Sequence, residues 1–286
     1  MDKHKMLRVH IVIPLIPTIK PYFCFKIQRK ALSSPFESEI SIEFEAPIWE
    51  VRPAGQMLFV TTRDKEQLQT QFSLFDLETN EFVFSNLAFE EDWWVSLYLF
   101  NGKQAVFQHY DDTQDIEKRS VFCFDCDNQE VIWSFDHVKL QQVSDQVIKC
   151  SAIEGEKEFF VDIKTGDKVN ASSQEEVKGS GSYPIQHAEE TTHYNLLIEF
   201  VKRHKEGLVG PIDYLEHKDF IFISANFLDQ DTYSLFLFVY DSEGALIEEV
   251  ELENDLSGQA IGTFFILDQA LIFVEKKHKI QVRRPR

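Results

Sequence analysis

Residues 72–84 of the chain read FSLFDLETNEFVF. An apolar stretch ends in Asp76, a short polar turn follows, and residues 82–84 form a second apolar stretch. Phenylalanine-rich stretches of this length favour β-strands, and an Asp followed by polar residues favours a turn. The segment therefore predicts two antiparallel strands joined by a tight turn.

The same pattern of strand, Asp, turn and strand occurs four times. The repeated aspartates are Asp76, Asp125, Asp162 and Asp241, so the gaps between them are 49, 37 and 79 residues. One four-stranded blade of a β-propeller takes about 40–50 residues. The first two gaps therefore each hold one module, and the third holds a module plus an insertion.

Further strands precede each aspartate. Residues 95–100 and 104–110 form the clearest hairpin, joined by Asn101-Gly102, a dipeptide that accepts positive φ at both central positions of a turn. Similar pairs are residues 213–216 with 220–224 and residues 263–267 with 270–274. The pattern predicts an all-β fold: a β-propeller of about five blades, each of four antiparallel strands. The five units begin near Trp49, Trp93, Val138, Ile212 and Gly262.

The last unit is short of one strand. It has three, at residues 263–267, 270–274 and 278–282, and then the sequence ends. Residues 38–45 have no partner of their own, and their apolar residues alternate with polar ones. We expect this N-terminal segment to supply the missing strand and to close the propeller, which removes two exposed sheet edges.

The insertion covers residues 171–211. Its first part is a Gly/Ser-rich loop, and residues 189–204 have helical periodicity, with Tyr194, Leu197, Phe200 and Val201 on one face. We expect a loop and one short helix here. Residues 1–37 are interpreted as a basic N-terminal extension, poorly ordered or preceding the true start, and residues 38–286 as a single propeller-like domain.

Charge and cysteine content limit the partners and the compartment. The net charge of −19 disfavours nucleic acid, although residues 1–38 carry a net +5. The longest apolar run of the N-terminal region, residues 9–19, is too short to span a bilayer. Four cysteines in 286 residues are not a disulfide framework, so a cytoplasmic location is expected. Export is the alternative, if residues 1–24 act as a signal.

Five short stretches carry a family resemblance. They are Ile48-Trp49, residues 93–97, His109-Tyr110-Asp111, residues 213–216 and residues 263–267. The resemblance as a whole spans residues 48–282. In these stretches the chain resembles an uncharacterised bacterial family known only as a domain of unknown function, with repeats like those of WD-repeat and quinoprotein-like propellers. The resemblance implies a propeller-like body and a cytoplasmic bacterial context. It implies no activity.

Residues 90–94, Glu-Glu-Asp-Trp-Trp, are the most suggestive cluster. Acids beside aromatic faces can hold sugars or cations. The predicted hairpin brings His109 and Tyr110 to the same end, so Trp93, Trp94, His109 and Tyr110 are the candidate ligand-binding residues for a protein or small molecule. The alternative is that the tryptophans only pack in the core.

No complete catalytic, metal or cofactor motif is present. Cys123 and Cys126 form a single C-x-x-C, for which core or turn positions are the alternative to a metal or redox role, and His187 and His193 are not spaced to stack on a helix. The sequence favours a non-enzymatic binding or interaction scaffold with no metal and no cofactor. One alternative is a carbohydrate-active hydrolase with carboxylates from Asp92, Asp111 and Asp213. The other is a secreted ligand-binding propeller.

Overall fold

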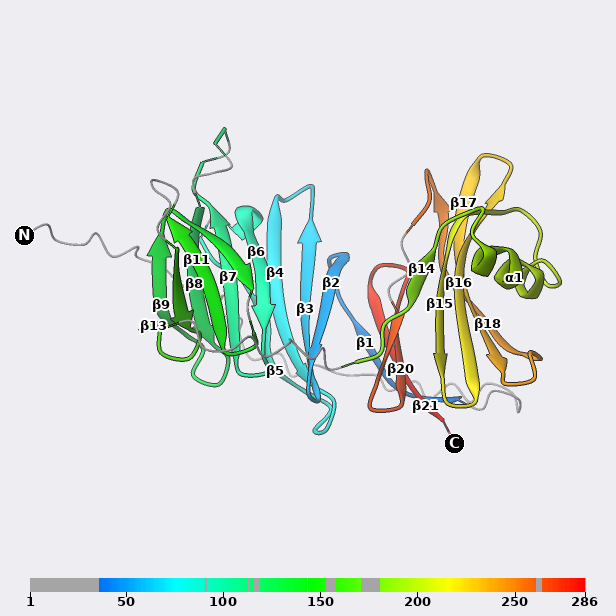
Figure 1. The fold of residues 1–286 in the computed structure, drawn as a ribbon, viewed down its shortest axis with the longest axis horizontal. Coiled ribbons are helices and arrows are strands. Elements are labelled where there is room, and N and C mark those ends of the chain that lie inside the picture. The colour runs from blue at the N-terminus through cyan, green and yellow to red at the C-terminus, as the bar shows by residue number, and fades with distance from the viewer. Residues whose placement is uncertain are drawn as a thin grey trace, which may run out of the picture. The chain divides into compact units, whose positions relative to one another are not determined.

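The computed structural model describes residues 36–90, 92–112, 114–115, 119–142, 144–152, 158–170, 181–260 and 264–285. The predicted signal over residues 1–24 and the loop over residues 171–180 lie outside them. The chain groups into two compact units. In Figure 1 the first is coloured from the blue of β2 through cyan to green, and the second from yellow-green to red, together with the blue β1. The predicted single domain over residues 38–286 stays a prediction.

The first unit contains three sheets of four antiparallel strands, each in chain order. The first sheet consists of β2 (Ile48–Ala54), β3 (Met57–Asp64), β4 (Gln69–Asp76) and β5 (Glu81–Leu87). The short turn η1 (Asp92–Trp94) leads to β6 (Val95–Phe100), β7 (Gln104–Tyr110), β8 (Arg119–Asp125) and β9 (Glu130–Asp136). The third sheet consists of β10 (Val138–Gln142), β11 (Val147–Ala152), β12 (Glu158–Asp162) and β13 (Lys168–Val169).

Phenylalanines fill the space between the first two sheets. Phe59 and Phe72 of one sheet and Phe107 and Phe122 of the other belong to a single buried cluster. The Phe72 and Phe107 rings are 4.8 Å apart between centroids, and the Phe107 and Phe122 rings stack at 5.2 Å. These ring contacts hold the first two sheets together face to face. They thereby also position the residues that follow the phenylalanines on the same strands.

The second unit contains one five-stranded and one four-stranded sheet. The larger consists of β14 (Ile185–His187), β15 (Leu208–His217), β16 (Phe220–Asp229), β17 (Thr232–Asp241) and β18 (Leu246–Leu256). The smaller consists of β19 (Phe264–Leu267), β20 (Ala270–Glu275), β21 (Lys279–Pro285) and β1 (Phe36–Glu43). Helix α1 (Thr192–Val201) covers one face of the larger sheet (Figure 1).

The predicted insertion differs from the expectation in one respect. Its helix is confirmed, with Tyr194, Leu197 and Val201 buried. The rest is not all loop, because β14 pairs with β15 and makes this sheet five-stranded instead of four-stranded. The short strand escapes hydrophobic pattern analysis because Ile185, its one large apolar residue, is 65% exposed and the pairing is made by the backbone.

The repeated aspartates cap the turns that follow them. The carboxylate of Asp76 accepts a hydrogen bond from the backbone N–H of Glu78, and that of Asp125 from Asn128, both at 2.8 Å. Asp162 accepts from Thr165 at 2.9 Å, and Asp241 from Glu243 and Ala245. A short side chain that replaces a backbone partner in this way stabilises a tight turn. The repeat in the sequence is therefore a repeat of one turn.

The predicted Asn-Gly turn is slightly different from expectation. Gly102 has a φ of 96°, but Asn101 is not among the residues with positive φ. Instead the Asn101 side chain accepts hydrogen bonds from the N–H groups of Lys103 and Gln104. The connection is a three-residue loop stabilised by the asparagine side chain.

The N-terminal strand completes the last sheet, as predicted. β1 pairs antiparallel with β21, and Ile42 lies opposite Ile280, both buried. The strand begins at Phe36, whose ring packs against Phe220 at 4.8 Å. The predicted fold class is thereby confirmed: the described residues form five antiparallel sheets and one α-helix, and strand β1 joins the last sheet.

Candidate functional site

One end of the first unit carries an arginine that contacts two tryptophans. The guanidinium carbon of Arg63 is 4.8 Å from the ring centroid of Trp49 and 5.6 Å from that of Trp93. These distances are those of cation–π contacts. We call Trp49, Arg63 and Trp93 the Trp–Arg cluster. It joins β2, β3 and the turn before β6, so it spans the first two sheets.

A bulge places Trp49 in this cluster. Ile48 pairs with Thr62 and Glu50 pairs with Thr61, so Trp49 is the extra residue on β2. Such a residue leaves the regular alternation of the strand and its side chain is redirected. Trp49 is 60% exposed and Trp94, the neighbour of Trp93, is 39% exposed. Core packing alone therefore does not account for these tryptophans.

Two arginines lie near Glu50, and Glu50 forms an ion pair with only one of them, Arg52. Glu50 pairs with Arg52, with 2.5 Å between Glu50 Oε1 and Arg52 Nε. Arg63 Nε is buried and has no hydrogen-bond partner among the described residues. Burial lowers the pKa of Arg63, and the negative charge of Glu50 opposes this shift. Arg63 is thus a partly desolvated cation with an unused donor.

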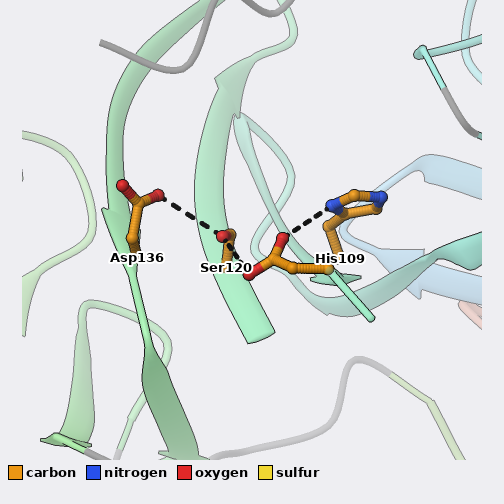
Figure 2. A network of polar contacts seen from close by, with 4 residues as sticks. His109, Ser120 and Asp136 are labelled. Carbon is orange, nitrogen blue, oxygen red and sulfur yellow. Dashed lines mark hydrogen bonds and ion pairs between the residues drawn. The ribbon is translucent and has the colours of Figure 1, made fainter. Parts of the chain in front are cut away.

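A second polar group lies at the end of the neighbouring sheet (Figure 2). His109 Nδ1 is 3.0 Å from Asp111 Oδ1, and the Ser120 hydroxyl donates to Asp111 Oδ2 at 2.7 Å. Ser120 Oγ also lies 3.3 Å from Asp136 Oδ1. His109, Ser120 and Asp136 are direct neighbours across β7, β8 and β9. The network therefore ties the ends of three strands together.

This network is not arranged for nucleophilic catalysis. A catalytic triad places histidine between serine and aspartate, so that the imidazole takes the serine proton. Here Asp111 lies between Ser120 and His109, and Ser120 is 2% exposed. The single hydroxyl proton of Ser120 is directed to a carboxylate, so the geometry supports a structural role for this serine.

The network of His109, Asp111 and Ser120 and the Trp–Arg cluster lie at the same end of their two sheets. Side chains alternate along a strand, so Arg63 projects from the same face of β3 as Phe59, and His109 from the same face of β7 as Phe107. The rings of Phe59 and Phe107 pack together, with 6.0 Å between their centroids. Trp93 lies two residues before Val95, which pairs directly with His109. Arg63 and His109 therefore both lie beyond the same phenylalanine layer.

Two buried hydroxyls belong to the same layer. Thr70 pairs with Arg63, and Thr61 pairs with Phe72. Neither Thr61 Oγ1 nor Thr70 Oγ1 has a hydrogen-bond partner among the described residues. Buried polar groups are usually paired, so these hydroxyls and the Arg63 donor are hydrogen-bonding capacity that the described residues leave unused at this end of the sheets.

The structure brings part of the predicted site together. Trp93, His109 and Tyr110 lie at the same end of the second sheet. Tyr110 also packs against Arg119, whose guanidinium carbon is 5.2 Å from the tyrosine ring centroid. Asp111 belongs to the polar network. Asp213 lies in the second unit, where Gln186 donates to its carboxylate at 3.3 Å. The side chain of Asp92 is outside the described residues, and the three-carboxylate site stays a prediction.

The C-x-x-C pair and the two histidines of the insertion lie outside the Trp–Arg cluster. Cys123 and Cys126 are fully buried in different core clusters, and burial raises the pKa of both thiols. His187 and His193 do stack, with ring centroids 5.3 Å apart, although their spacing argued against it. The reason is that His187 lies on β14 and only His193 lies on the helix.

Sequence reasoning missed Trp49, Arg63 and Glu50 as site residues. One signal was available. Trp49 and Trp93 both stand at the start of the first strand of a module, so they occupy equivalent ends of adjacent sheets. No local pattern marks Arg63, which lies 14 residues from Trp49 and 30 from Trp93.

Solved structures with low similarity to the chain include propeller domains. The β-propeller domain of the trilobed protease from Pyrococcus furiosus is 11% identical, with a TM-score of 0.31 over 84% of this chain and 81% of that one. A member of the DUF4221 family from Bacteroides vulgatus is 10% identical, with a TM-score of 0.33 over 89% and 99%. Pyrococcus horikoshii acylaminoacyl peptidase is 11% identical, with a TM-score of 0.29, and the chain spans 36% of its length.

Comparison of the sequence with known families matches only part of the chain. No curated protein matches the chain. Among the described residues, no helix has the length and apolar content needed to cross a bilayer. Residues 51–133, which include Arg63, Trp93 and the network of His109, Asp111 and Ser120, match a domain of unknown function, DUF4905.

Proposed function

We propose that this chain is a non-enzymatic binding scaffold and that its ligand binds at the Trp–Arg cluster. The observation that carries the proposal is the position of Arg63 over the faces of Trp49 and Trp93, with Trp49 60% exposed. Tryptophan, tyrosine and arginine are the residues enriched at the hot spots of protein interfaces.

The polar network supports a binding role over a catalytic one. It holds the ends of β7, β8 and β9 in register beside the cluster, and its serine is buried behind Asp111. A rigid framework under exposed aromatic residues reduces the entropy lost on binding. The three buried, unpaired cysteines of the described region support a reducing compartment, which agrees with the expected cytoplasmic location.

A thermal-shift screen against sugars, carboxylic acids, nucleotides and metal ions tests the proposal. We expect at least one class to raise Tm in the wild type and not in Trp49→Ala, which removes the exposed indole with little loss of core. Trp133→Phe is the matched control, because Trp133 lies in a different core cluster. Equal shifts in wild type and Trp49→Ala would place the ligand elsewhere and contradict the proposal, and conversion of a bound compound to product would show an enzyme.

A further inference from the structure

We propose that Arg63 recognises a carboxylate, so that the ligand of the Trp–Arg cluster is an organic acid with an apolar or aromatic part. This inference rests on the proposed function, since it names the class of ligand that the cluster binds. It concerns the chemistry of one guanidinium and the two indoles beside it.

The indole faces already hold a cation. A ring attracts a positive charge through the negative potential of its face, and Arg63 occupies that position on both Trp49 and Trp93. A second cation at the cluster would meet a like charge. The arrangement therefore disfavours the cationic ligands that acids beside tryptophans first suggested, and it favours an anion.

The nearby acid is engaged elsewhere. Glu50 is the carboxylate whose potential acts on Arg63, but its Oε1 is 2.5 Å from Arg52 Nε. Arg52 also donates to the carbonyl of Tyr98 on β6, so it is held in place between two sheets. Because Glu50 is paired with Arg52, Arg63 has no ion-pair partner of its own among the described residues.

The donors at Arg63 fit a planar oxyanion. A guanidinium offers its N–H groups as a planar fork, and a carboxylate accepts two of them in parallel. Arg63 is half-buried: its Nε is buried and without a partner, and the buried Thr61 and Thr70 hydroxyls on the same face of the sheet also have none among the described residues. The exposed face of Trp49 then offers apolar contact to the remainder of the ligand.

Phenylacetate is a suitable probe, because it combines a carboxylate with a ring. Three of the four tryptophans, Trp49, Trp93 and Trp94, lie at this end of the first unit, so tryptophan fluorescence in a Trp133→Phe background reports binding there. We expect saturable quenching by phenylacetate, with a Kd in the range of about 0.1–10 mM. Phenylacetamide, which has the same shape without the charge, should bind at least about tenfold more weakly.

Arg63→Gln should weaken phenylacetate binding by about tenfold or more and leave the weak binding of phenylacetamide unchanged. Arg203→Gln is the matched control, because Arg203 also stacks on an aromatic ring, that of Phe200, but in the second unit. Urea unfolding of each variant shows that the fold is retained. Inorganic phosphate serves as a second anion, which lacks the ring and should not depend on Trp49.

Three results would overturn the inference: no binding of phenylacetate up to about 10 mM, equal binding of the acid and the amide, or equal binding by wild type and Arg63→Gln. None of them decides the proposed function. If a sugar or another neutral compound raises Tm in a Trp49-dependent way, the cluster is a binding site without carboxylate recognition. If no compound class depends on Trp49, both proposals are wrong.

Discussion

The backbone N–H of Ala245 donates a hydrogen bond to Asp241 Oδ1 at 2.8 Å. The same carboxylate oxygen accepts from Glu243, so one side chain closes the turn between β17 and β18. Equivalent aspartates end β4, β8 and β12. The last sheet has no such turn, because its outer strand β1 comes from the other end of the chain. The sequence repeat thus marks where each outer strand begins.

Replacing Asp241 by alanine should lower the free energy of unfolding by about 1–2 kcal/mol, since two backbone donors lose their partner. Urea unfolding measures the change. Asp241→Asn keeps the accepting oxygen and should lose less than half as much. Asp231→Ala, at an exposed turn residue, is the control, and a loss as large as that of Asp241→Ala would contradict the capping role.

Gly166 should tolerate no side chain. Its φ is 76°, and a Cβ there would lie 2.6 Å from Cγ of Trp133, whose indole N–H donates to the Ile163 carbonyl at 2.7 Å. We expect Gly166→Ala to lower the free energy of unfolding by more than about 2 kcal/mol, from backbone strain and displacement of the ring.

Gly55 separates these two causes. Its φ is 60° but a Cβ there meets nothing within 4 Å, so Gly55→Ala should cost only about 1 kcal/mol. Chemical denaturation of both variants gives the comparison. Equal losses at the two glycines would show that contact with Trp133 contributes nothing.

Glu50→Gln should strengthen anion binding at Arg63. Removing the carboxylate removes the negative potential that Glu50 places on Arg63 and frees Arg52 as a second cation. We expect the Kd for phenylacetate to fall by about twofold to tenfold at low salt, an effect that added salt reduces. An unchanged or weaker affinity would mean that Glu50 does not compete with the ligand.

Alkaline pH should destabilise the protein through its buried thiols. Burial raises the pKa of Cys126 and of Cys150 to about 12. Above the unfolded-state pKa of about 8.5 the unfolded chain releases these protons while the native state keeps them, so stability is complete below that pH and falls as the pH rises. Each thiol contributes a slope of about 1.4 kcal/mol per pH unit in this window.

The variant Cys150→Ala tests this slope directly. It should lose stability at neutral pH by leaving a small cavity, yet it should lose less than the wild type between about pH 9 and pH 11. Urea midpoints across this range provide the measurement. Parallel pH curves for the two proteins would show that Cys150 ionises equally in both states.

Most of the fold could be predicted from the sequence, because its strands and turns are determined by residues that are neighbours in the chain. Strands follow from alternating apolar residues, and the turns follow from the Asp side chains that cap them. The pairing of β1 with β21 was predictable for another reason: the last module lacked a strand and one segment near the N-terminus lacked a partner. Strand β14 was not predictable, since its exposed residues carry no hydrophobic signal.

The site was predictable only in part. Trp93, His109 and Tyr110 are close in sequence to one hairpin, so the sequence brings them together. Arg63 is placed by strand pairing within another sheet, and Trp49 by a bulge, and neither event leaves a local motif. Contacts between residues of different sheets depend on how the sheets pack against each other. Short sequence patterns do not reveal this packing.

The pairing of the first strand with the last is tested most directly by a disulfide between Glu43→Cys and Lys279→Cys. These residues lie opposite each other, with 3.3 Å between Lys279 Nζ and Glu43 Oε1. In a Cys24→Ser background, mild oxidation of the native protein should form this bond nearly completely, because opposed Cα atoms of antiparallel strands lie about 4.5–5.5 Å apart. The pair Glu43→Cys and Arg284→Cys, five residues or about 16 Å farther along β21, should stay reduced. Absence of the first bond, or equal formation of both, would contradict the fold.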